Sequence, residues 1–411
     1  MNKKDSIAVV PKYRFPEFAL DASIDYVAGG FLFDPITNRN HHADLPILAI
    51  TQEYGAIPRD EIDYKVSVTK KSLKAYKIVE KGDFIISLRS FQGGIEYSMY
   101  DGICSPAYII LRKKTNIIDQ YYKYYFKSHR FIQDLNKDLE GIRDGKMISY
   151  GQFSSILLPK PDEEEQQKIV DCLSSIDDLI SVEEKKLSLL NDYKKGWMQK
   201  LFPAEGKTVP EWRFPEFKDD NNWKCVEIET VGKVITGKTP PTSNDSLWNG
   251  SIQFVTPTDI VGDKYQRLVQ RTVVKTSNMK VLPKGTIMFT CIASVGKMAI
   301  SVYPCVTNQQ INSIITKKGY YNEFIYYSLF RNVNKIKSGL SNTTVPIINK
   351  TNFSKIQISV TLNEKEQQKI ANFLSGIDDL ISTQADRIEA LKQHKQALMQ
   401  GLFPAVEEVW K

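Results

Sequence analysis

Apolar residues recur at spacings of three and four along two stretches of the chain, Asp162 to Phe202 and Asn363 to Phe403. This period places them on one stripe of a helix and is typical of a coiled-coil seam. Polar residues interrupt both seams at matching positions, Glu183 and Lys194 in the first and Gln384 and Lys395 in the second. The seams themselves contain Ile169, Leu173, Ile176, Ile180, Leu187, Leu190, Trp197 and Leu201, and then Ile370, Leu374, Ile377, Ile381, Ile388, Leu391, Leu398 and Leu402. The pattern predicts two long helices that share one packing register.

Each predicted helix belongs to a repeat of about 200 residues, a feature to look for before any local motif. PKYRFPEF at Pro11 returns as PEWRFPEF at Pro210, EEQQKIVDCLSSIDDLIS at Glu164 returns as KEQQKIANFLSGIDDLIS at Lys365, and MQKLFPA returns as MQGLFPA. Between these motifs, short runs of Val, Ile, Phe and Tyr are broken by Gly, Pro, Asn and Asp, which predicts strands and loops. We therefore expect an α+β protein with a globular domain at 1–160, a helix at 161–204, a second globular domain at 205–360 and a second helix at 361–411.

Chain order predicts how the helices pair. Each follows a large domain instead of its partner helix, so the simplest closed arrangement is an antiparallel pair with one domain at each end. Forty residues make a rod of about 60 Å, and polar seam residues fix alignment at a cost in stability. The alternative is a helical hairpin that merely completes a core.

Charge is distributed unevenly along the chain. The first helical stretch holds ten acidic and six basic residues and the second holds six acidic and five basic, a combined charge of −5. Because the whole chain carries +7, the remainder carries +12. Basic character outside the helices indicates that the globular parts face an anionic partner such as nucleic acid.

Other features exclude several classes. The five cysteines contain no C-x-x-C pair, the four histidines lack metal-ligand spacing, and we expect neither a disulfide framework nor a metal site. No apolar run reaches the 18 to 20 or so residues that cross a bilayer, and the N-terminus lacks a signal-like apolar stretch. We expect a cytoplasmic protein without a membrane partner.

Loop residues that present donors and acceptors are the candidates for reading base edges in the major groove, where Arg or Lys suits guanine and Asn or Gln suits adenine. An ordinary turn-capping role is the alternative for each of them. In the first domain the candidates are Thr51, Gln52, Arg89, Ser90, Gln92, Arg143 and Lys146, and in the second they are Thr256, Thr258, Asp259, Lys297, Asn308, Gln309, Gln310, Asn342, Thr343 and Thr344.

Two aromatic segments are predicted to be helical, DQYYKYYFKSHRF from Asp119 and NEFIYYSLFRNVNKIKSG from Asn322. Tyrosines on all sides of a helix favour a role in the core and in domain contacts. A platform for stacking bases is the alternative.

Taken together, RFPEF, the EQQKI and IDDLIS helices, the LFPA ends and the second-half series GKTPP, VTPTDI, LPKGTI and TNQQIN resemble the specificity subunit of type I restriction-modification enzymes. The resemblance covers essentially the whole chain. The first half departs from it, with LAITQEY and SLRSFQGG in place of VTPTDI and CIASVGK.

The resemblance implies two target-recognition domains that each bind one half of a split double-stranded DNA target, while the paired helices set the spacing. It implies two adenine-N6 methyltransferase subunits that use S-adenosylmethionine, and restriction and translocation subunits that use ATP and Mg. The chain itself is expected to bind no cofactor and to hold no catalytic residue, and it lacks the [DN]-P-P-[FYW] motif of adenine methyltransferases.

Two other functions compete with DNA reading. Gly232 to Thr239, GKVITGKT, matches the phosphate-binding G-x-x-x-x-G-K-[ST] pattern, which would suggest an ATPase. Pro240 and Pro241 follow at once, whereas such a loop must open a helix, so a turn is the preferred interpretation. The third possibility is a scaffold that uses the coiled coil to assemble partners without nucleic acid.

Overall fold

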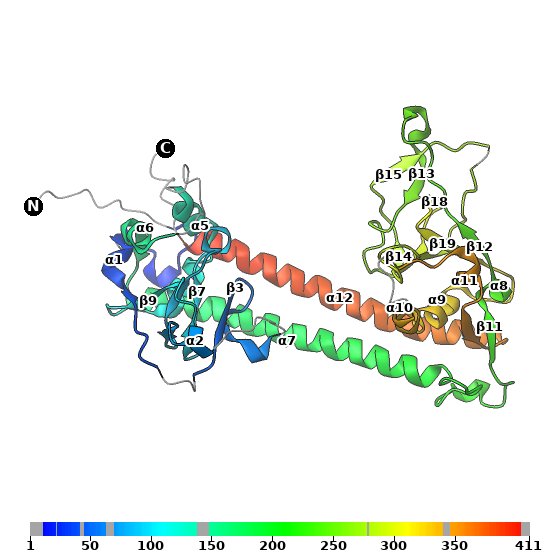
Figure 1. The fold of residues 1–411 in the computed structure, drawn as a ribbon, viewed down its shortest axis with the longest axis horizontal. Helices are drawn as coiled ribbons and strands as arrows, with labels where there is room; N and C mark the ends of the chain where they lie inside the picture. The colour runs from blue at the N-terminus through cyan, green and yellow to red at the C-terminus, as the bar shows by residue number, and fades with distance from the viewer. Residues whose placement is uncertain are drawn as a thin grey trace, which may run out of the picture. The chain divides into compact units, whose positions relative to one another are not determined.

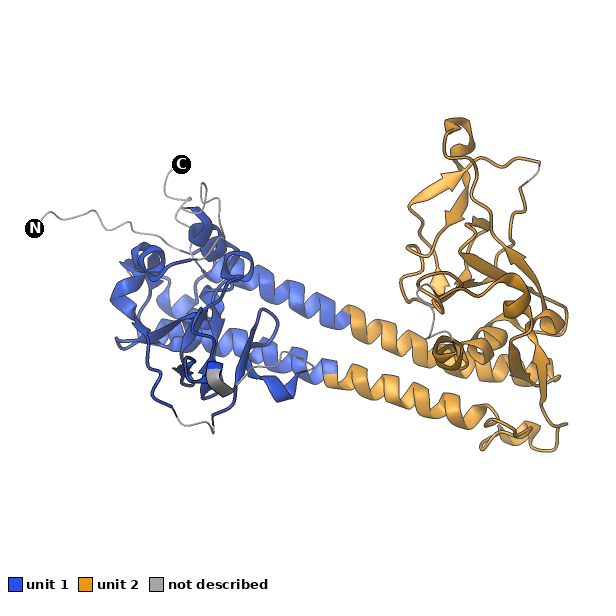
Figure 2. Ribbon diagram, viewed as in Figure 1, with its two compact units in different colours: residues 1–184, 387–411 blue, residues 185–386 orange. Residues whose placement is uncertain are grey.

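The computed structural model describes residues 11–21, 23–41, 45–62, 70–137, 148–277, 279–339 and 346–403. The chain divides into two compact units, residues 1–184 with 387–411 and residues 185–386 (Figures 1 and 2). Each unit combines strands, short helices and a part of both long helices. The α+β class and the repeat predicted from the sequence are confirmed.

The first unit begins its fold with short strands that alternate with single-turn helices. Its four-stranded antiparallel sheet has the order β2-β9-β6-β7, and three strand pairs, β1-β10, β3-β4 and β5-β8, surround it. The elements are β1 (Asp25–Ala28), α1 (Gly29–Leu32), β2 (Phe33–Ile36), β3 (Leu48–Thr51), β4 (Gly55–Pro58), α2 (Lys70–Leu73), β5 (Lys77–Val79), β6 (Phe84–Ile86), α3 (Ser90–Gly93), β7 (Glu96–Tyr97), β8 (Gly102–Cys104), β9 (Ile109–Lys113), α4 (Asp119–Tyr125), α5 (His129–Asn136), α6 (Tyr150–Ser155) and β10 (Leu157–Lys160).

The second unit repeats this plan with longer strands. A five-stranded sheet has the order β12-β19-β16-β17-β14, a three-stranded sheet has the order β15-β13-β18, and β11 pairs with β20 as β1 does with β10. The elements are β11 (Lys224–Glu227), α8 (Ile228–Val231), β12 (Gly232–Thr236), β13 (Trp248–Val255), β14 (Tyr265–Gln266), β15 (Arg271–Val273), β16 (Ile287–Thr290), β17 (Met298–Ser301), β18 (Cys305–Thr307), β19 (Ile311–Thr316), α9 (Asn322–Phe330), α10 (Val333–Ser338), α11 (Lys350–Ser354) and β20 (Gln357–Val360).

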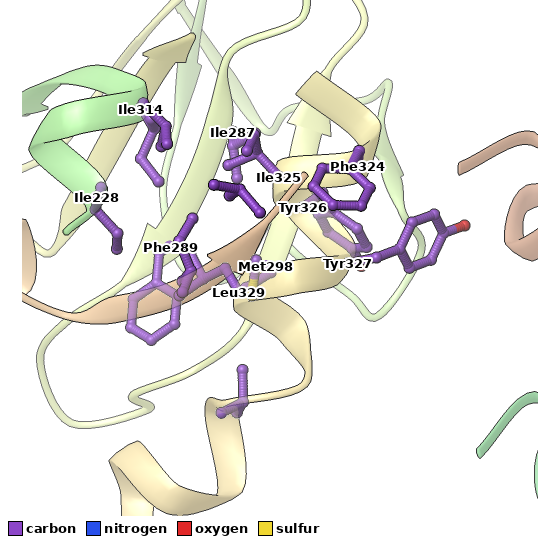
Figure 3. Close-up of a cluster of buried hydrophobic side chains, with 14 of the residues drawn as sticks. Ile228, Ile287, Phe289, Met298, Ile314, Phe324, Ile325, Tyr326, Tyr327 and Leu329 are labelled. Carbon is purple, nitrogen blue, oxygen red and sulfur yellow. The ribbon is translucent and has the colours of Figure 1, made fainter. Parts of the chain in front are cut away.

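The aromatic helices lie in the cores. In the second unit, Phe324, Ile325 and Tyr327 of α9 are fully buried in one cluster with Ile287 and Phe289 of β16 (Figure 3). In the first unit, the tyrosines of α4 are buried in the same way. Burial of large aromatic surfaces supplies much of a core's stability, so the core role predicted for both segments is confirmed.

The two long helices, α7 (Glu163–Leu201) and α12 (Glu364–Leu402), run antiparallel within each unit. In the first unit, ion pairs join Asp177 to Lys395 and Glu184 to Lys392, so residue numbers rise along one helix as they fall along the other. In the second unit, Lys194 pairs with Asp378. Figure 2 shows a part of each helix in both units.

Each unit's core takes residues from both helices. The start of α7 contributes Ile169 and Leu173 to the first core, where Leu402 of α12 also lies. The second core receives Ile370 from the start of α12 and Leu201 from the end of α7. The helices therefore complete the two cores as well as pairing with each other, but they are not a helical hairpin, because a whole domain separates them in the chain.

A repeated buried ion pair explains why RFPEF and EQQKI recur together. Arg14 of the first RFPEF donates two hydrogen bonds to Glu165, at 2.8 and 2.7 Å, and Arg213 of the second donates two to Glu366, at 2.7 and 2.8 Å. The next residue, Gln166 or Gln367, uses its side-chain oxygen to accept a hydrogen bond from a backbone N–H beside α4 or α9. Both motifs thus attach a domain to the first turn of the helix that follows it.

All five cysteines are free thiols in the structure. Cys104, Cys291 and Cys305 are buried, as small apolar side chains often are. Cys225 is exposed on β11 and departs from that pattern.

Candidate nucleic-acid interface

In the first recognition domain, two loops that are distant in sequence meet at the candidate residues. The side-chain amide of Gln52, after β3, donates a hydrogen bond to the carbonyl of Arg89, before α3, at 3.1 Å. Thr51 accepts a hydrogen bond from the Tyr54 N–H at 2.9 Å and donates to the Gly55 carbonyl at 3.2 Å, so its hydroxyl closes the β3–β4 turn. The structure therefore brings Thr51 and Gln52 to the same place as the second loop.

The second loop divides its candidates by exposure. Ser90 is only 1% exposed and its hydroxyl accepts a hydrogen bond from the Ser87 N–H at 2.8 Å, which holds the loop's shape. Arg89 and Gln92 are exposed. In the part of the chain that the structure describes, the guanidinium of Arg89 makes no hydrogen bond or ion pair, so it remains available for an external acceptor.

In the second domain, the turn after β13 is held by its own polar side chains. Both the Thr256 N–H and its hydroxyl donate to the Asp259 carboxylate, at 2.8 and 2.7 Å, and the Thr258 hydroxyl lies 2.7 Å from that of Thr256. The second Asp259 oxygen accepts the Gln270 N–H at 2.9 Å. These contacts match the turn-capping role that was the alternative to base contact.

A second turn, between β18 and β19, carries the amide candidates. Asn308 is buried and shares two hydrogen bonds with Gln310: its side-chain amide donates to the Gln310 side-chain oxygen at 2.9 Å, and its side-chain oxygen accepts from the Gln310 N–H at 3.1 Å. Gln309 is exposed, and its side-chain oxygen accepts a hydrogen bond from the Thr239 hydroxyl at 2.6 Å. Gln309 is thus held in place on the surface, and its side-chain N–H groups make no hydrogen bond to a described residue.

Backbone contacts join these turns with the loop between β16 and β17. The Asn308 N–H donates to the Val255 carbonyl at 3.2 Å, and the Cys291 N–H donates to the Gln310 carbonyl at 2.7 Å. Exposed Lys297 places its ammonium 3.5 Å from the Pro257 carbonyl. The second-domain candidates in the described residues therefore gather at one edge of the sheets.

Asn312 fixes the floor of this edge. Its side-chain oxygen accepts a hydrogen bond from Thr236 at 2.6 Å, and its amide donates to the Cys291 thiol at 3.0 Å. Burial raises the pKa of Cys291 to about 11, so the thiol stays protonated at neutral pH. The hydrogen bonds join β12, β16 and β19 below the candidate loops.

Five candidates lie outside the described residues: Arg143, Lys146, Asn342, Thr343 and Thr344. In the second domain, the segment that follows them is described. Ile347 bridges Ile292, and the Ile348 N–H donates to the Cys291 carbonyl at 2.9 Å, so residues 346–348 border the β16–β17 loop.

Two features of the β16–β17 loop were missed from the sequence. Ala293 has φ of 61°, a left-handed conformation that costs energy for any residue with a side chain. Such outliers cluster at functional sites. Lys337 of α10 packs its aliphatic chain against Gly296 of the same loop. The lysines at the end of the α9–α10 segment could have drawn attention to Lys337. No local sequence pattern indicated the left-handed backbone conformation of Ala293.

The phosphate-loop match at Gly232 to Thr239 has the wrong structure for nucleotide binding. Its first five residues form β12, an edge strand that pairs with β19, and residues 237–244 contain no helix. A phosphate-binding loop of this class needs a helix N-terminus directly after it. The missing helix argues against the ATPase interpretation, while the match itself lies in a strand and the connection after it, not in a turn.

Among the described residues, no group of three or more His, Cys, Asp or Glu side chains is placed to hold a metal ion. Within the same part of the chain, every helix is too short or too polar to cross a membrane.

The chain matches the model of the type I restriction modification DNA specificity domain twice, over residues 34–192 and 220–393. It is 32% identical to the type I restriction enzyme MjaIX specificity subunit of Methanocaldococcus jannaschii over 203 residues, 46% of each chain. It is 26% identical to the MjaVIII specificity subunit of the same organism over 370 residues, which cover 84% of this chain and 83% of the relative.

Solved structures share the fold. The S subunit of a type I restriction-modification system from M. genitalium superposes with a TM-score of 0.56 at 14% identity, over 96% of this chain and 99% of the other. A chain from work on complex assembly and conformational transition of the type I R-M system gives a TM-score of 0.58 at 16% identity, over 92% and 97%. With two domain matches that together span most of its length, this chain belongs to the specificity subunits of type I restriction-modification systems, which recognise the DNA target and are not catalytic.

Proposed function

We propose that the two recognition domains, predicted at 1–160 and 205–360, each read one half of a bipartite double-stranded DNA target. The helices within 161–204 and 361–411 set the distance between the half-sites. The observation that carries this proposal is the contrast within the repeat: the Arg14–Glu165 and Arg213–Glu366 attachments are the same in both halves, whereas the candidate loops differ. One frame with two different loop sets is suited to two different half-sites.

Direct readout would come from the exposed polar groups at the loop edges. The Arg89 guanidinium suits a guanine, and the side-chain amides of exposed Gln92 and Gln309 suit adenine. Lys297 can contact a guanine or a phosphate. Thr51, Ser90, Thr256 and Asp259 hold the loops in shape, and the remaining candidates, Gln52, Thr258, Asn308, Gln310, Arg143, Lys146, Asn342, Thr343 and Thr344, stay predictions for base or backbone contact.

The charge distribution supports binding to the DNA backbone. The chain outside the helical stretches carries +12, computed from its overall +7 and the −5 of the helices. Lys and Arg that neutralise phosphates release counterions, so affinity should fall steeply as salt rises.

Catalysis would belong to partners. We propose two methyltransferase subunits with S-adenosylmethionine, and restriction subunits with ATP and Mg, in a cytoplasmic complex in which this chain holds no cofactor. Large apolar side chains on the long helices support docking: Leu179 and Val182 of α7 are exposed in the first unit, and Leu189 of α7 and Leu380 of α12 are exposed in the second. Exposed apolar groups of this size often mark protein contacts.

The test is to map methylated adenines across the genome of cells that carry the complete system, and to measure binding of the purified chain with its methyltransferase subunits to the mapped sequence. We expect a split motif and an affinity that falls steeply between 50 and 200 mM salt, by about a thousandfold for six phosphate contacts. Binding that is absent or insensitive to salt would favour the scaffold function instead.

A further inference from the structure

A pocket in the second recognition domain lies beside the loop that carries Gln309. It encloses about 380 Å³ between the end of β12 and the segment that precedes β16. Its walls are mostly apolar, with Leu247, Met279 and Leu282 among them, and two lysines, Lys238 and Lys280, lie on its lining. The lining includes no carboxylate.

Both lysines are available to a ligand. They are exposed, and neither forms a hydrogen bond or an ion pair with any described residue. Two ammonium groups beside one pocket, without an acidic partner, create a positive potential that favours an anion.

One buried hydroxyl in the pocket also lacks a partner. Thr307 is 2% exposed, lines the pocket, and its hydroxyl oxygen makes no hydrogen bond within the described structure. A β-carbon on Gly237 would lie 2.3 Å from this oxygen, so only glycine leaves room beside it. Buried polar groups are nearly always satisfied, so this hydroxyl is an exception in the wall of the pocket.

The same basic pair recurs at equivalent positions of the first domain. Ile36 to Asn40 reads ITNRN where Ile235 to Thr239 reads ITGKT, and both segments follow strands with the same antiparallel pairing, β2 with β9 and β12 with β19. Lys77 to Gly82 reads KIVEKG where Lys280 to Gly285 reads KVLPKG. Arg39 and Lys77 therefore occupy the positions of Lys238 and Lys280.

The first-domain pair is close in space. The Ile78 N–H donates to the Asn38 carbonyl at 2.8 Å, which holds the Arg39 segment against β5. Lys77 is 8% exposed and donates to the Tyr108 carbonyl at 2.6 Å, and no described carboxylate pairs with it. Burial, reinforced by nearby Arg39, lowers the pKa of Lys77. A cation held in this way without a counter-charge is costly, which an external anion would offset.

We propose that Lys238 with Lys280, and Arg39 with Lys77, form one duplicated clamp that binds a phosphate of the DNA backbone in each recognition domain. The inference rests on the proposed function and assigns it residues that are independent of base sequence. The Thr239–Gln309 hydrogen bond places the second clamp next to a candidate base reader, as expected when phosphate contacts fix the register of base contacts. The loops of the two domains differ because they read different bases, whereas the clamp recurs because every nucleotide carries a phosphate.

The test uses the full chain with its methyltransferase subunits and the motif found by methylation mapping. Lys238→Ala with Lys280→Ala is compared with Lys318→Ala, which removes an exposed lysine after the opposite end of β19. We expect the double variant to lose affinity by the same factor on cognate and non-cognate duplexes. The slope of log affinity against log salt should become shallower by about 2, or about 1 for each lysine. The methylated motif should be unchanged, and Lys318→Ala should bind as the parent does.

Arg39→Ala provides the matching variant in the first domain, where replacing buried Lys77 would endanger the fold. A scan of single neutral methylphosphonate linkages then locates the contact. One substituted linkage should lower the DNA affinity of the parent complex but leave the affinity of the double variant unchanged. A different linkage should lower the affinity of the parent but not that of Arg39→Ala.

Several results would overturn the clamp. One is a double variant whose affinity has the same salt slope as that of the parent. Others are a loss of affinity confined to the cognate duplex, or a changed methylated motif. The last is a rise in thermal stability on adding ATP that the double variant lacks, although it binds DNA as the parent does. If the parent complex itself fails to bind DNA, the proposed function is wrong, which is a different outcome from a clamp variant that binds as the parent does.

Discussion

The ammonium group of Lys395 lies 2.5 Å from a carboxylate oxygen of Asp177, and Tyr124 donates a hydrogen bond to the other oxygen at 2.8 Å. The second half repeats the arrangement, with Lys194 and Tyr327 both at 2.5 Å from the carboxylate of Asp378. Each carboxylate therefore joins a recognition domain, through its tyrosine, to both long helices. Lys194 and Lys395, the polar residues that interrupt the two seams, therefore supply the cations of two equivalent ion pairs.

We predict that this pair stabilises the second unit measurably. Lys194 and Asp378 side chains are each 18% exposed, so their interaction is only partly screened by water. A double-mutant cycle with Lys194→Ala and Asp378→Ala should give a coupling of about 1 to 3 kcal/mol in urea unfolding. The exposed pair Lys392–Glu184 is the control and should give less than about 1 kcal/mol. Equal couplings for the two pairs would contradict a special role for the partly buried pair, Lys194–Asp378.

The sequence predicted these helices well because their signal is local. A period of three and four over forty residues needs no knowledge of distant parts of the chain. It located Lys194 and Lys395 as interruptions but not their partners, since the aspartates lie on the other helix of the pair. The tyrosines of α4 and α9 were assigned to the core correctly, because aromatic residues on all sides of a helix leave no solvent-facing side.

The candidate site was harder to predict because strand pairing and loop contacts are long-range. Gln52 and Arg89 were both candidates, yet nothing in either segment indicated that they touch. Burial of Ser90 depends on how α3 packs, and the left-handed Ala293 lies next to the long-range bridge between Ile292 and Ile347. Residue type suggested which side chains are able to bind DNA, but tertiary structure decides which are exposed.

The buried ion pair of the repeated RFPEF motif should be essential for folding. Arg213→Ala would leave the Glu366 carboxylate, which is fully buried, without its cation, at a cost of about 3 to 5 kcal/mol. Arg213→Lys keeps the charge but loses the two parallel hydrogen bonds, so an intermediate loss is expected. Lys369→Ala is the control, because its pair with Glu216 is about half exposed. Urea unfolding of the full chain provides the measurement, and a loss no larger than that of Lys369→Ala would refute the prediction.

The acid sensitivity of the second unit should depend on Glu323. Burial alone would raise its pKa, but hydrogen bonds from Tyr265 and Ser375 and the charge of Lys264 outweigh burial and lower the pKa below the ordinary 4.5. A carboxyl whose pKa is lower in the folded state contributes stability above the unfolded value, and this contribution is lost as pH falls through the folded value. Glu323→Gln should therefore be less stable than the parent at pH 7, and the difference should shrink below pH 4.5.

Unfolding free energies of both proteins between pH 7 and pH 3.5 would test this. Glu211→Gln, at an exposed position, is the control and should leave the pH dependence unchanged. A difference between Glu323→Gln and the parent that stays constant across this range would mean that Glu323 contributes by packing alone.

Exchange of one recognition domain should change one half of the DNA target. The strand pair of β1 with β10 aligns Asp25 with Lys160, so an exchange of Asp21–Lys160 for the equivalent segment of a relative moves both strands together. Arg14 and Glu165 lie outside the exchanged segment and keep their ion pair. Methylation mapping should then show one new half-site, the original second half-site and the same spacing. A change in both half-sites would contradict independent reading.

The spacer should lengthen when both helices are extended together. An insertion in α7 alone would shift Lys194 away from Asp378 or Glu184 away from Lys392, because these pairs lie on opposite sides of the insertion point. One heptad added to α7 between Leu187 and Leu190, with one added to α12 between Thr383 and Arg387, keeps every pair in register. Seven residues add about 10 Å of helix, equivalent to about three base pairs of B-DNA. Methylation mapping should show the same two half-sites with about three more unspecified bases between them. The single-helix insertion is the matched control and should lower stability and activity, since one set of ion pairs must break. Unchanged spacing in an active double-insertion variant would show that the helices do not determine the distance.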